Sequence, residues 1–205
     1  MDRKDIVLEQ INENNFILLD NCFFGYTDST ETYRNLSKTL YKAKRMKSLE
    51  KLTECIYSLD EAWRWELSNI INKDNVYTIP EIIEEMKAFS TVLQNAYNWH
   101  YQKIKEKISD KRLNSDTNIS ETYPVMLYLN HLIKDVRKST GRLKIYQGPR
   151  EELSRLIKDA SETDYGLVEA AMGYCMENSE DKIAIFSGDQ HIPLIIRSFL
   201  LEGNN

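Results

Sequence analysis

The sequence predicts an α/β fold, in which a small central parallel sheet is flanked by helices and long helical insertions are added. Three short apolar runs have the character of strands that are covered on both faces: Phe16–Leu19, Val76–Ile79 and Ile183–Phe186. Long stretches with apolar residues at helical spacing separate these runs. Because strands that alternate with helices are joined by crossovers, we expect the strands to be parallel.

Other elements follow from the same patterns. Arg142–Tyr146 is a weaker candidate for a fourth strand. Pro80 suits the first turn of a helix, and Pro124 should be tolerated only in an opening turn. The predicted helices run, in chain order, over Thr30 to about Arg45, Lys47 to about Asn72, Pro80 towards Ile108, Ser120 or Glu121 to Ser139, Glu151–Asp159, Thr163–Glu177 and His191–Leu201.

The length of 205 residues suits one medium domain with a proper core. Only 7 glycines and 4 prolines are present, which favours long helices over a turn-rich β fold. The segments at about 28–73 and 95–140 are longer than a crossover helix requires. We therefore predict a single domain over residues 1–205, with helical elaborations in these two segments.

Composition narrows the class of protein. A net charge of −5 argues against a strongly basic protein that coats nucleic acid, although local basic patches are compatible with it. The three cysteines lie far apart, as free thiols in a reducing compartment do. The charged first residues lack the apolar core of a signal peptide, and no apolar run approaches membrane-spanning length. We expect a cytoplasmic protein with no membrane association.

Four acidic residues follow the predicted strands. Asp20 comes directly after the first strand, and Asp189 follows shortly after the last. Glu85 lies in the first turns of the helix after the second strand, and Asp164 begins a helix at the head of its apolar stripe. Because reactive groups collect at the carboxyl ends of parallel strands, these four carboxylates should lie near one edge of the sheet.

Each acid alone has an ordinary structural explanation. Asp20 and Asp189 are typical turn residues, Asp164 is a favourable charge at a helix start, and Glu85 has acidic neighbours that suit a solvated face. The convergence of all four, without a cluster of histidines or cysteines, points to a bound cation. An all-oxygen site of this kind suits Mg²⁺ or Mn²⁺.

Four motifs surround these acids in order. They are FILLDNCFF with Asp20, VYTIPEIIEEMKAF with Glu85 (or Glu84 as the fallback), ETDYGLVEAAM with Asp164, and KIAIFSGDQHI with Asp189. The ordered set resembles the PIN-domain nucleases, a family of metal-dependent ribonucleases with a central parallel sheet and an acidic cluster. The resemblance covers about a quarter of the chain and implies a PIN-like fold to which the two long helical segments are additions.

Three further residues are implied as a second layer around the acids: Asn21, Ser187 and His191. Ser187 matches the closing Ser/Thr-x-Asp motif and would bond to an acid side chain or a substrate phosphate. His191 stands where many relatives have a further Asp. It would contact a phosphate, replace a metal ligand, or cap the final helix.

The resemblance implies hydrolysis of RNA, with single strands favoured. Asp20, Asp164 and Asp189 would hold Mg²⁺ or Mn²⁺, and Glu85 would complete the ligand set or orient the attacking water. Two alternatives stay open: an inactive PIN-like scaffold that binds a protein partner through the helical insertions, and a toxin or defence ribonuclease controlled by an antitoxin. Candidate phosphate contacts come from two basic groups, although most such charge runs are solvated faces and the net charge of −5 slightly favours that explanation. They are Lys42, Lys44, Arg45, Lys47, Lys51, Lys134, Arg137, Lys138, Arg142 and Lys144.

Overall fold

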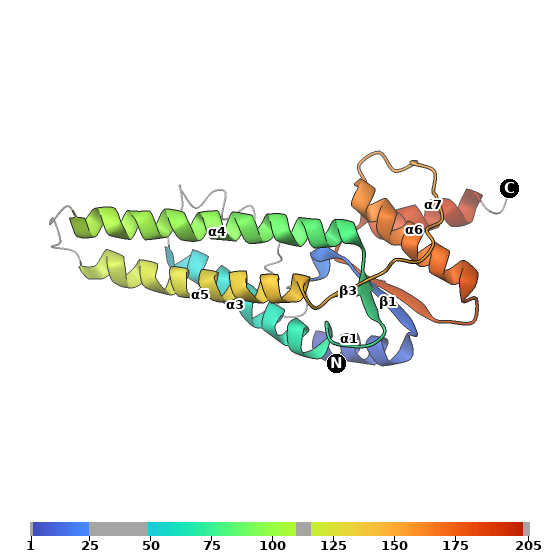
Figure 1. Ribbon diagram of the computed structural model, residues 1–205, viewed down its shortest axis with the longest axis horizontal. Coiled ribbons are helices and arrows are strands. Elements are labelled where there is room, and N and C mark those ends of the chain that lie inside the picture. Colours follow the sequence, from blue (N-terminus) through green and yellow to red (C-terminus); the bar gives the residue numbers. More distant parts are fainter. Residues whose placement is uncertain (1, 25–48, 110–115, 203–205) are drawn as a thin grey trace. The chain divides into compact units, whose positions relative to one another are not determined.

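The computed structural model describes residues 2–24, 49–109 and 116–202 (Figure 1). The chain divides into two compact units. The sheet unit comprises Met1–Phe23, Ser68–Glu85 and Arg142–Asn205, and the helical unit comprises Phe24–Leu67 and Met86–Gly141. The helical unit takes in most of the two segments that were predicted as helical elaborations.

The sheet unit contains four parallel strands in the order β3-β2-β1-β4. The strands are β1 (Phe16–Leu19), β2 (Val76–Thr78), β3 (Lys144–Ile145) and β4 (Ile183–Phe186). In the register of the sheet, Ile17 pairs with both Val76 and Ala184. This arrangement confirms the predicted α/β class and its small parallel sheet.

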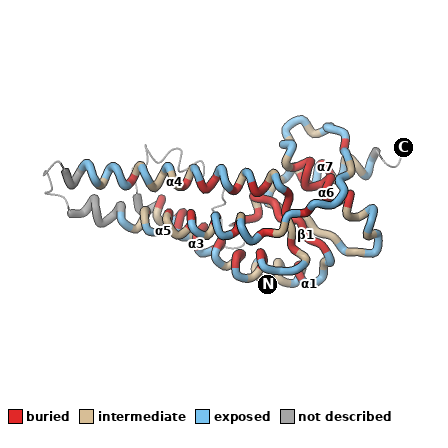
Figure 2. Tube along the Cα trace, viewed as in Figure 1, coloured by how far each residue is buried: buried red, intermediate tan, exposed pale blue. Residues whose placement is uncertain are grey.

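Strand β1 lies at the centre of the core, and all four of its residues are buried. Its Phe16 ring stacks on Tyr174 of α6 (Glu162–Glu177), with 3.9 Å between the ring centroids. Helix α6 also packs against β4 and against α7 (His191–Glu202). Figure 2 shows buried residues along β1 and along α6. The expectation of a strand covered on both faces is confirmed for β1, whereas all four residues of β4 are only half-buried, so that expectation was wrong for β4.

Two elements of the sheet unit were not predicted: α1 (Arg3–Glu13) and a 3-10 turn at Asn21–Phe23. The helix α1 is polar and buries only Ile11, so its sequence carries little of the apolar periodicity from which helices are predicted. Its end is held from outside, because Asn75 Nδ2 donates to the carbonyls of Ile11 at 2.8 Å and Asn14 at 2.7 Å.

The predicted helix over Glu151–Asp159 is wrong, because this segment is not helical. Several of its backbone donors bond to α6, although the Leu156 N–H donates to the Ser154 carbonyl within the segment. The N–H of Glu151 donates to the carbonyl of Glu169 at 3.0 Å, and the N–H of Ile157 donates to the Tyr165 hydroxyl at 2.8 Å. Because partners on α6 already satisfy these N–H groups, forming a helix would not provide additional hydrogen bonds for them.

Three helices extend through the helical unit: α3 (Leu49–Asn69), α4 (Pro80–Ser109) and α5 (Asp116–Thr140). The helix α5 begins earlier than predicted, so Pro124 lies inside it rather than in its opening turn. The expectation that Pro124 would be tolerated only in an opening turn was wrong. The helix continues through Pro124, and proline removes only one of its backbone hydrogen bonds. Within the described residues, no helix is both long enough and apolar enough to cross a membrane.

The core of the helical unit is built on Trp63, which is fully buried. Its Nε1 donates to Ser139 Oγ at 2.9 Å, and its ring stacks on Phe24 with centroids 4.6 Å apart. The predicted helix from Thr30 to about Arg45 lies outside the described residues. So do the side chains of the first basic group: Lys42, Lys44, Arg45, Lys47 and Lys51.

Candidate functional site

The sheet unit brings the four predicted acids to the carboxyl edge of its sheet. Asp20 directly follows β1, and its N–H donates to the Phe186 carbonyl at the end of β4 at 2.9 Å. Asp189 follows β4, Glu85 lies in the second turn of α4, and Asp164 lies in the first turn of α6. The spatial convergence expected from a parallel sheet is therefore present.

Asp20 is buried, with 3% of its surface exposed. Burial raises the pKa of its carboxyl group to about 6, and the negative charges of Asp164 and Glu85 act in the same direction. The Ser187 hydroxyl opposes this rise by donating to Asp20 Oδ2 at 2.5 Å. Ser187 thus bonds to an acid side chain, one of the two contacts expected of it. Asp20 ionises less readily than an ordinary aspartic acid side chain.

Glu85 is held by two side chains. Thr163 Oγ1 donates to Glu85 Oε1 at 2.7 Å, and Asn21 Nδ2 donates to Oε2 at 3.3 Å. Sequence reasoning did not place Thr163 in the site, although its position beside Asp164 was a signal. Asn21 is 2% exposed, and its Oδ1 is buried without a hydrogen-bond partner among the described residues. An unpaired buried oxygen costs about 1–3 kcal/mol, so this atom favours a donor or a cation.

Asp164 takes part in a capping box at the start of α6. The Ser161 hydroxyl accepts from the Asp164 N–H at 3.1 Å, and the Ser161 N–H donates to Asp164 Oδ2 at 2.7 Å. The structural explanation of Asp164 as a helix-start charge is therefore confirmed. Its carboxylate still acts on the site, because its charge raises the pKa of Asp20.

Asp189 is paired with His191, the first residue of α7. Asp189 Oδ1 accepts from the His191 N–H at 2.9 Å and lies 2.8 Å from His191 Nδ1. The same Nδ1 lies 3.9 Å from Asp164 Oδ2. The Asp189 N–H in turn donates to Ser187 Oγ at 2.9 Å. Three of the predicted residues after β4 therefore form one connected network with Asp20 and Asp164.

Cys22 lies among these carboxylates, which sequence reasoning missed. Burial raises the pKa of its thiol, and the charges of Asp20, Asp189 and Glu85 raise it further. The thiol therefore stays protonated and is a poor nucleophile. Cys22, Cys55 and Cys175 are thiols that form no disulfide.

The donors of this edge suit a hard cation in their chemistry. Carboxylate oxygens predominate, and the Asn21 Oδ1 oxygen is unsatisfied. The pKa of Asp20 is raised mainly by burial, and the negative charges of Asp164 and Glu85, which a cation would offset, raise it further. Within residues 2–24, 49–109 and 116–202, however, no three His, Cys, Asp or Glu side chains are gathered closely enough to hold an ion as they stand. Binding would require the carboxylates to turn away from their present hydrogen-bond donors.

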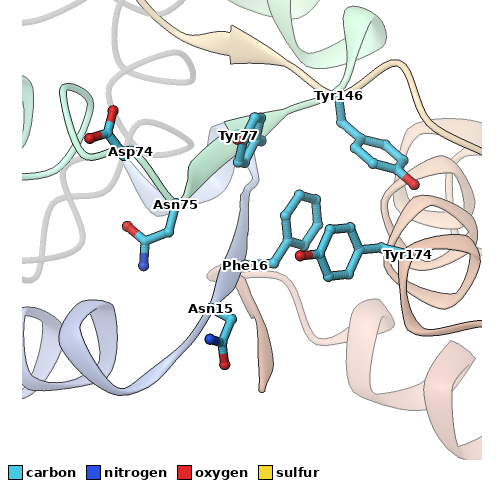
Figure 3. Close-up of a pocket in the computed structure, with 7 residues that line it drawn as sticks. All are labelled: Asn15, Phe16, Asp74, Asn75, Tyr77, Tyr146 and Tyr174. Atoms are coloured by element: carbon cyan, nitrogen blue, oxygen red, sulfur yellow. The ribbon is translucent and has the colours of Figure 1, made fainter. Parts of the chain in front are cut away.

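A second feature of the sheet unit is an aromatic cavity of about 400 Å³ near the opposite end of β1 (Figure 3). Phe16 lies at its centre, and its ring stacks on Tyr77 with centroids 5.1 Å apart. Tyr174 Oη donates to Asp181 Oδ2 at 2.7 Å. The lining residues are Asn15, Phe16, Asp74, Asn75, Tyr77, Tyr146 and Tyr174. None of the four predicted acids lines this cavity.

The chain matches no family model, and comparisons with curated proteins and with solved structures return no match.

Proposed function

We propose that this chain is a metal-dependent endoribonuclease of the PIN-like type, which hydrolyses RNA phosphodiester bonds at the carboxyl edge of the sheet. The observation that carries the proposal is the meeting of Asp20, Glu85, Asp164 and Asp189, from four separate segments, in one electrostatic network. Asp20 and Asp164 are buried, and Glu85 and Asp189 are half-buried. Because carboxylates repel one another and are costly to bury without a partner, a divalent cation is the simplest group that would stabilise them together.

Each residue has a distinct role in the proposed reaction. Asp20, Asp164 and Asp189 would hold Mg²⁺ or Mn²⁺. When bound, the ion supplies activation of a water molecule and neutralises charge on the phosphoryl oxygens. Glu85, whose two oxygens are fixed by Thr163 and Asn21, would complete the ligand set or orient that water. Ser187 keeps Asp20 in position.

Contacts to the RNA backbone must come from basic side chains, since the acidic edge repels phosphate. Lys134 and Lys138 are exposed and lie four residues apart on α5, so they share one face of that helix. Arg137 donates to Ser90 and Gln94, and Lys144 lies 2.8 Å from Asp74 Oδ1. We propose Lys134 and Lys138 as phosphate contacts. A cytoplasmic location and single-stranded RNA as the substrate belong to the same proposal.

The test is cleavage of labelled single-stranded RNA with Mn²⁺, with Mg²⁺ and with a chelator. We expect metal-dependent cleavage by the wild type, and its loss in Asp189→Asn. The matched control is Asp159→Asn, because Asp159 is exposed and lies in the segment before α6. Equal cleavage by the wild type and Asp189→Asn would contradict the proposed site.

Two observations favour a second candidate, an inactive scaffold that binds a protein partner. His191 already pairs with Asp189, and among the described side chains no three ligands are poised for an ion. If the protein cleaves neither single-stranded RNA, structured RNA nor flapped DNA with any metal, the scaffold replaces the nuclease as the proposed function. A toxin or defence ribonuclease shares the proposed chemistry. Toxicity on expression that Asp20→Asn abolishes would favour that biological role.

A further inference from the structure

The helical unit contains a small polar pocket of about 220 Å³ between α4 and α5. The described side chains that line it are two basic groups and three hydroxyl groups, and none of them is acidic. They are Lys87, Ser90 and Thr91 of α4, and Arg137 and Thr140 of α5. Sites for drug-sized ligands have volumes of about 300–1,000 Å³, so this pocket suits a single small anionic group.

Arg137 is held at this pocket by neutral partners. Its Nε donates to Ser90 Oγ at 3.1 Å, and its Nη2 donates to Gln94 Oε1 at 3.2 Å. Ser90 is 5% exposed, so the first bond fixes the guanidinium group against a buried hydroxyl. Arg137 forms no ion pair with any residue of the described ranges, and these two bonds occupy only part of its fork of N–H donors. The remaining N–H groups can therefore bind an anion.

The composition of the pocket favours a terminal phosphate group. Lys87 and Arg137 bring two positive charges to one small volume, and an anion bound between them offsets their repulsion. A terminal phosphate carries about −1.5 to −2 charges at pH 7, whereas a phosphodiester within a strand carries a single charge. Arginine matches phosphate oxygens with parallel N–H bonds, and lysine adds a point charge. The hydroxyls of Thr91 and Thr140, which donate to the carbonyls of Lys87 and Arg137, can rotate to donate to the same ligand.

We propose that this pocket binds the terminal phosphate of an RNA strand. The identity of the strand rests on the proposed function, whereas the choice of a phosphate rests on the pocket alone. The link to RNA is the position of Lys134 and Lys138, the proposed contacts to the RNA backbone. Lys134 lies one turn before Arg137 on α5, and residues three apart share a helix face. An RNA strand that these lysines hold would therefore present its phosphates beside the pocket.

The test is the affinity of the full chain for one short RNA that carries a 5′-phosphate, a 3′-phosphate, or hydroxyl groups at both ends. Fluorescence anisotropy with chelator present measures binding without cleavage. We expect the wild type to bind one of the phosphorylated RNAs at least about tenfold more tightly, since hydrogen bonds to charged groups have effects of this size. Arg137→Gln and Lys87→Gln should remove most of this preference. Lys103→Gln should keep it, because the exposed Lys103 pairs with Glu106 on the same helix.

Calorimetric titration with inorganic phosphate separates the two sources of this ligand. If phosphate ions bind in a manner that Arg137→Gln abolishes, but the three RNAs bind equally, the pocket takes free phosphate and the assignment to RNA fails. Equal affinity for the three RNAs without binding of phosphate ions would overturn the whole inference, and cleavage by the wild type with Mn²⁺ would still decide the nuclease. A preference for phosphorylated RNA in a protein that cleaves no RNA would support the pocket and contradict the nuclease.

Discussion

Asp20 illustrates how one residue combines a cost in stability with a role in the proposed chemistry. Burial raises the pKa of this carboxyl group to about 6, whereas its ordinary value is 3.8. Asp60 of the helical unit has the same raised pKa of about 6, also through burial, and Arg64 opposes the rise by donating to it at 2.6 Å. A comparison of variants is therefore needed to assign a pH dependence to Asp20.

We predict that Asp20 makes the protein lose stability as the pH rises from about 4 to 6. Between the unfolded pKa of 3.8 and the folded pKa of about 6, the folded state binds more protons than the unfolded state. The free energy of unfolding therefore falls as the pH rises through this range, and Asp20 causes no further change above it. The full change is at most about 3 kcal/mol for a shift of this size. Urea unfolding of the wild type and Asp20→Asn, with chelator present, measures it.

The stability difference between Asp20→Asn and the wild type should grow in favour of the variant across this pH range. A difference that is the same at pH 4 and pH 7 would show that Asp20 titrates normally in the folded protein. Asp60 contributes equally to both proteins, so its own titration cancels in the comparison.

At the scale of elements, α6 organises both the site and the segment before it. Its first turn presents Thr163 and Asp164 to the acids, and Glu169 accepts from the Leu153 N–H and from Arg155. The segment that was predicted as a helix is consequently held against α6 by tertiary bonds. A glycine makes part of this approach feasible. A Cβ at Gly173 would lie 2.1 Å from the Pro149 carbonyl oxygen.

Gly173→Ala should therefore destabilise the protein by about 1–3 kcal/mol, since the backbone at Pro149 has to move to relieve the overlap. Gly141→Ala is the matched control, because a Cβ there would meet its nearest atoms at 3.8 Å, an ordinary contact distance. Urea unfolding of both variants measures the effect. Equal stability of the two variants would mean that the 149–150 segment does not need this close approach.

At the scale of the whole molecule, a ligand that binds only the folded chain must stabilise it. If the acidic edge holds Mn²⁺, the unfolding temperature of the wild type should rise with the concentration of Mn²⁺. At 100 times the dissociation constant the gain is about 2.7 kcal/mol. Asp189→Asn should lose most of this gain and Asp159→Asn should keep it. An unfolding temperature that Mn²⁺ leaves unchanged in the wild type would contradict a metal site.

The sequence by itself determined the features that depend on local chemistry. Apolar runs marked β1, β2 and β4, and Pro80 marked the start of α4. Two acids, Asp20 and Asp189, follow strands, and the other two, Glu85 and Asp164, lie near the starts of the helices α4 and α6. These predictions succeeded because apolar periodicity and proline geometry act within a few residues. The convergence of the acids followed because parallel strands must end at the same edge.

Only the tertiary structure decided which side chains bond to each acid of the site. The positions of Thr163, Asn21 and His191 beside the acids did not reveal which acid each one would contact. In the folded chain Thr163 and Asn21 hold Glu85, and His191 pairs with Asp189. The sequence of residues 151–159 predicts a helix, because it does not reveal the groups on α6 that bond to this backbone. The physical reason is common to these cases, because a hydrogen bond between residues far apart in sequence depends on where the folded chain places both partners.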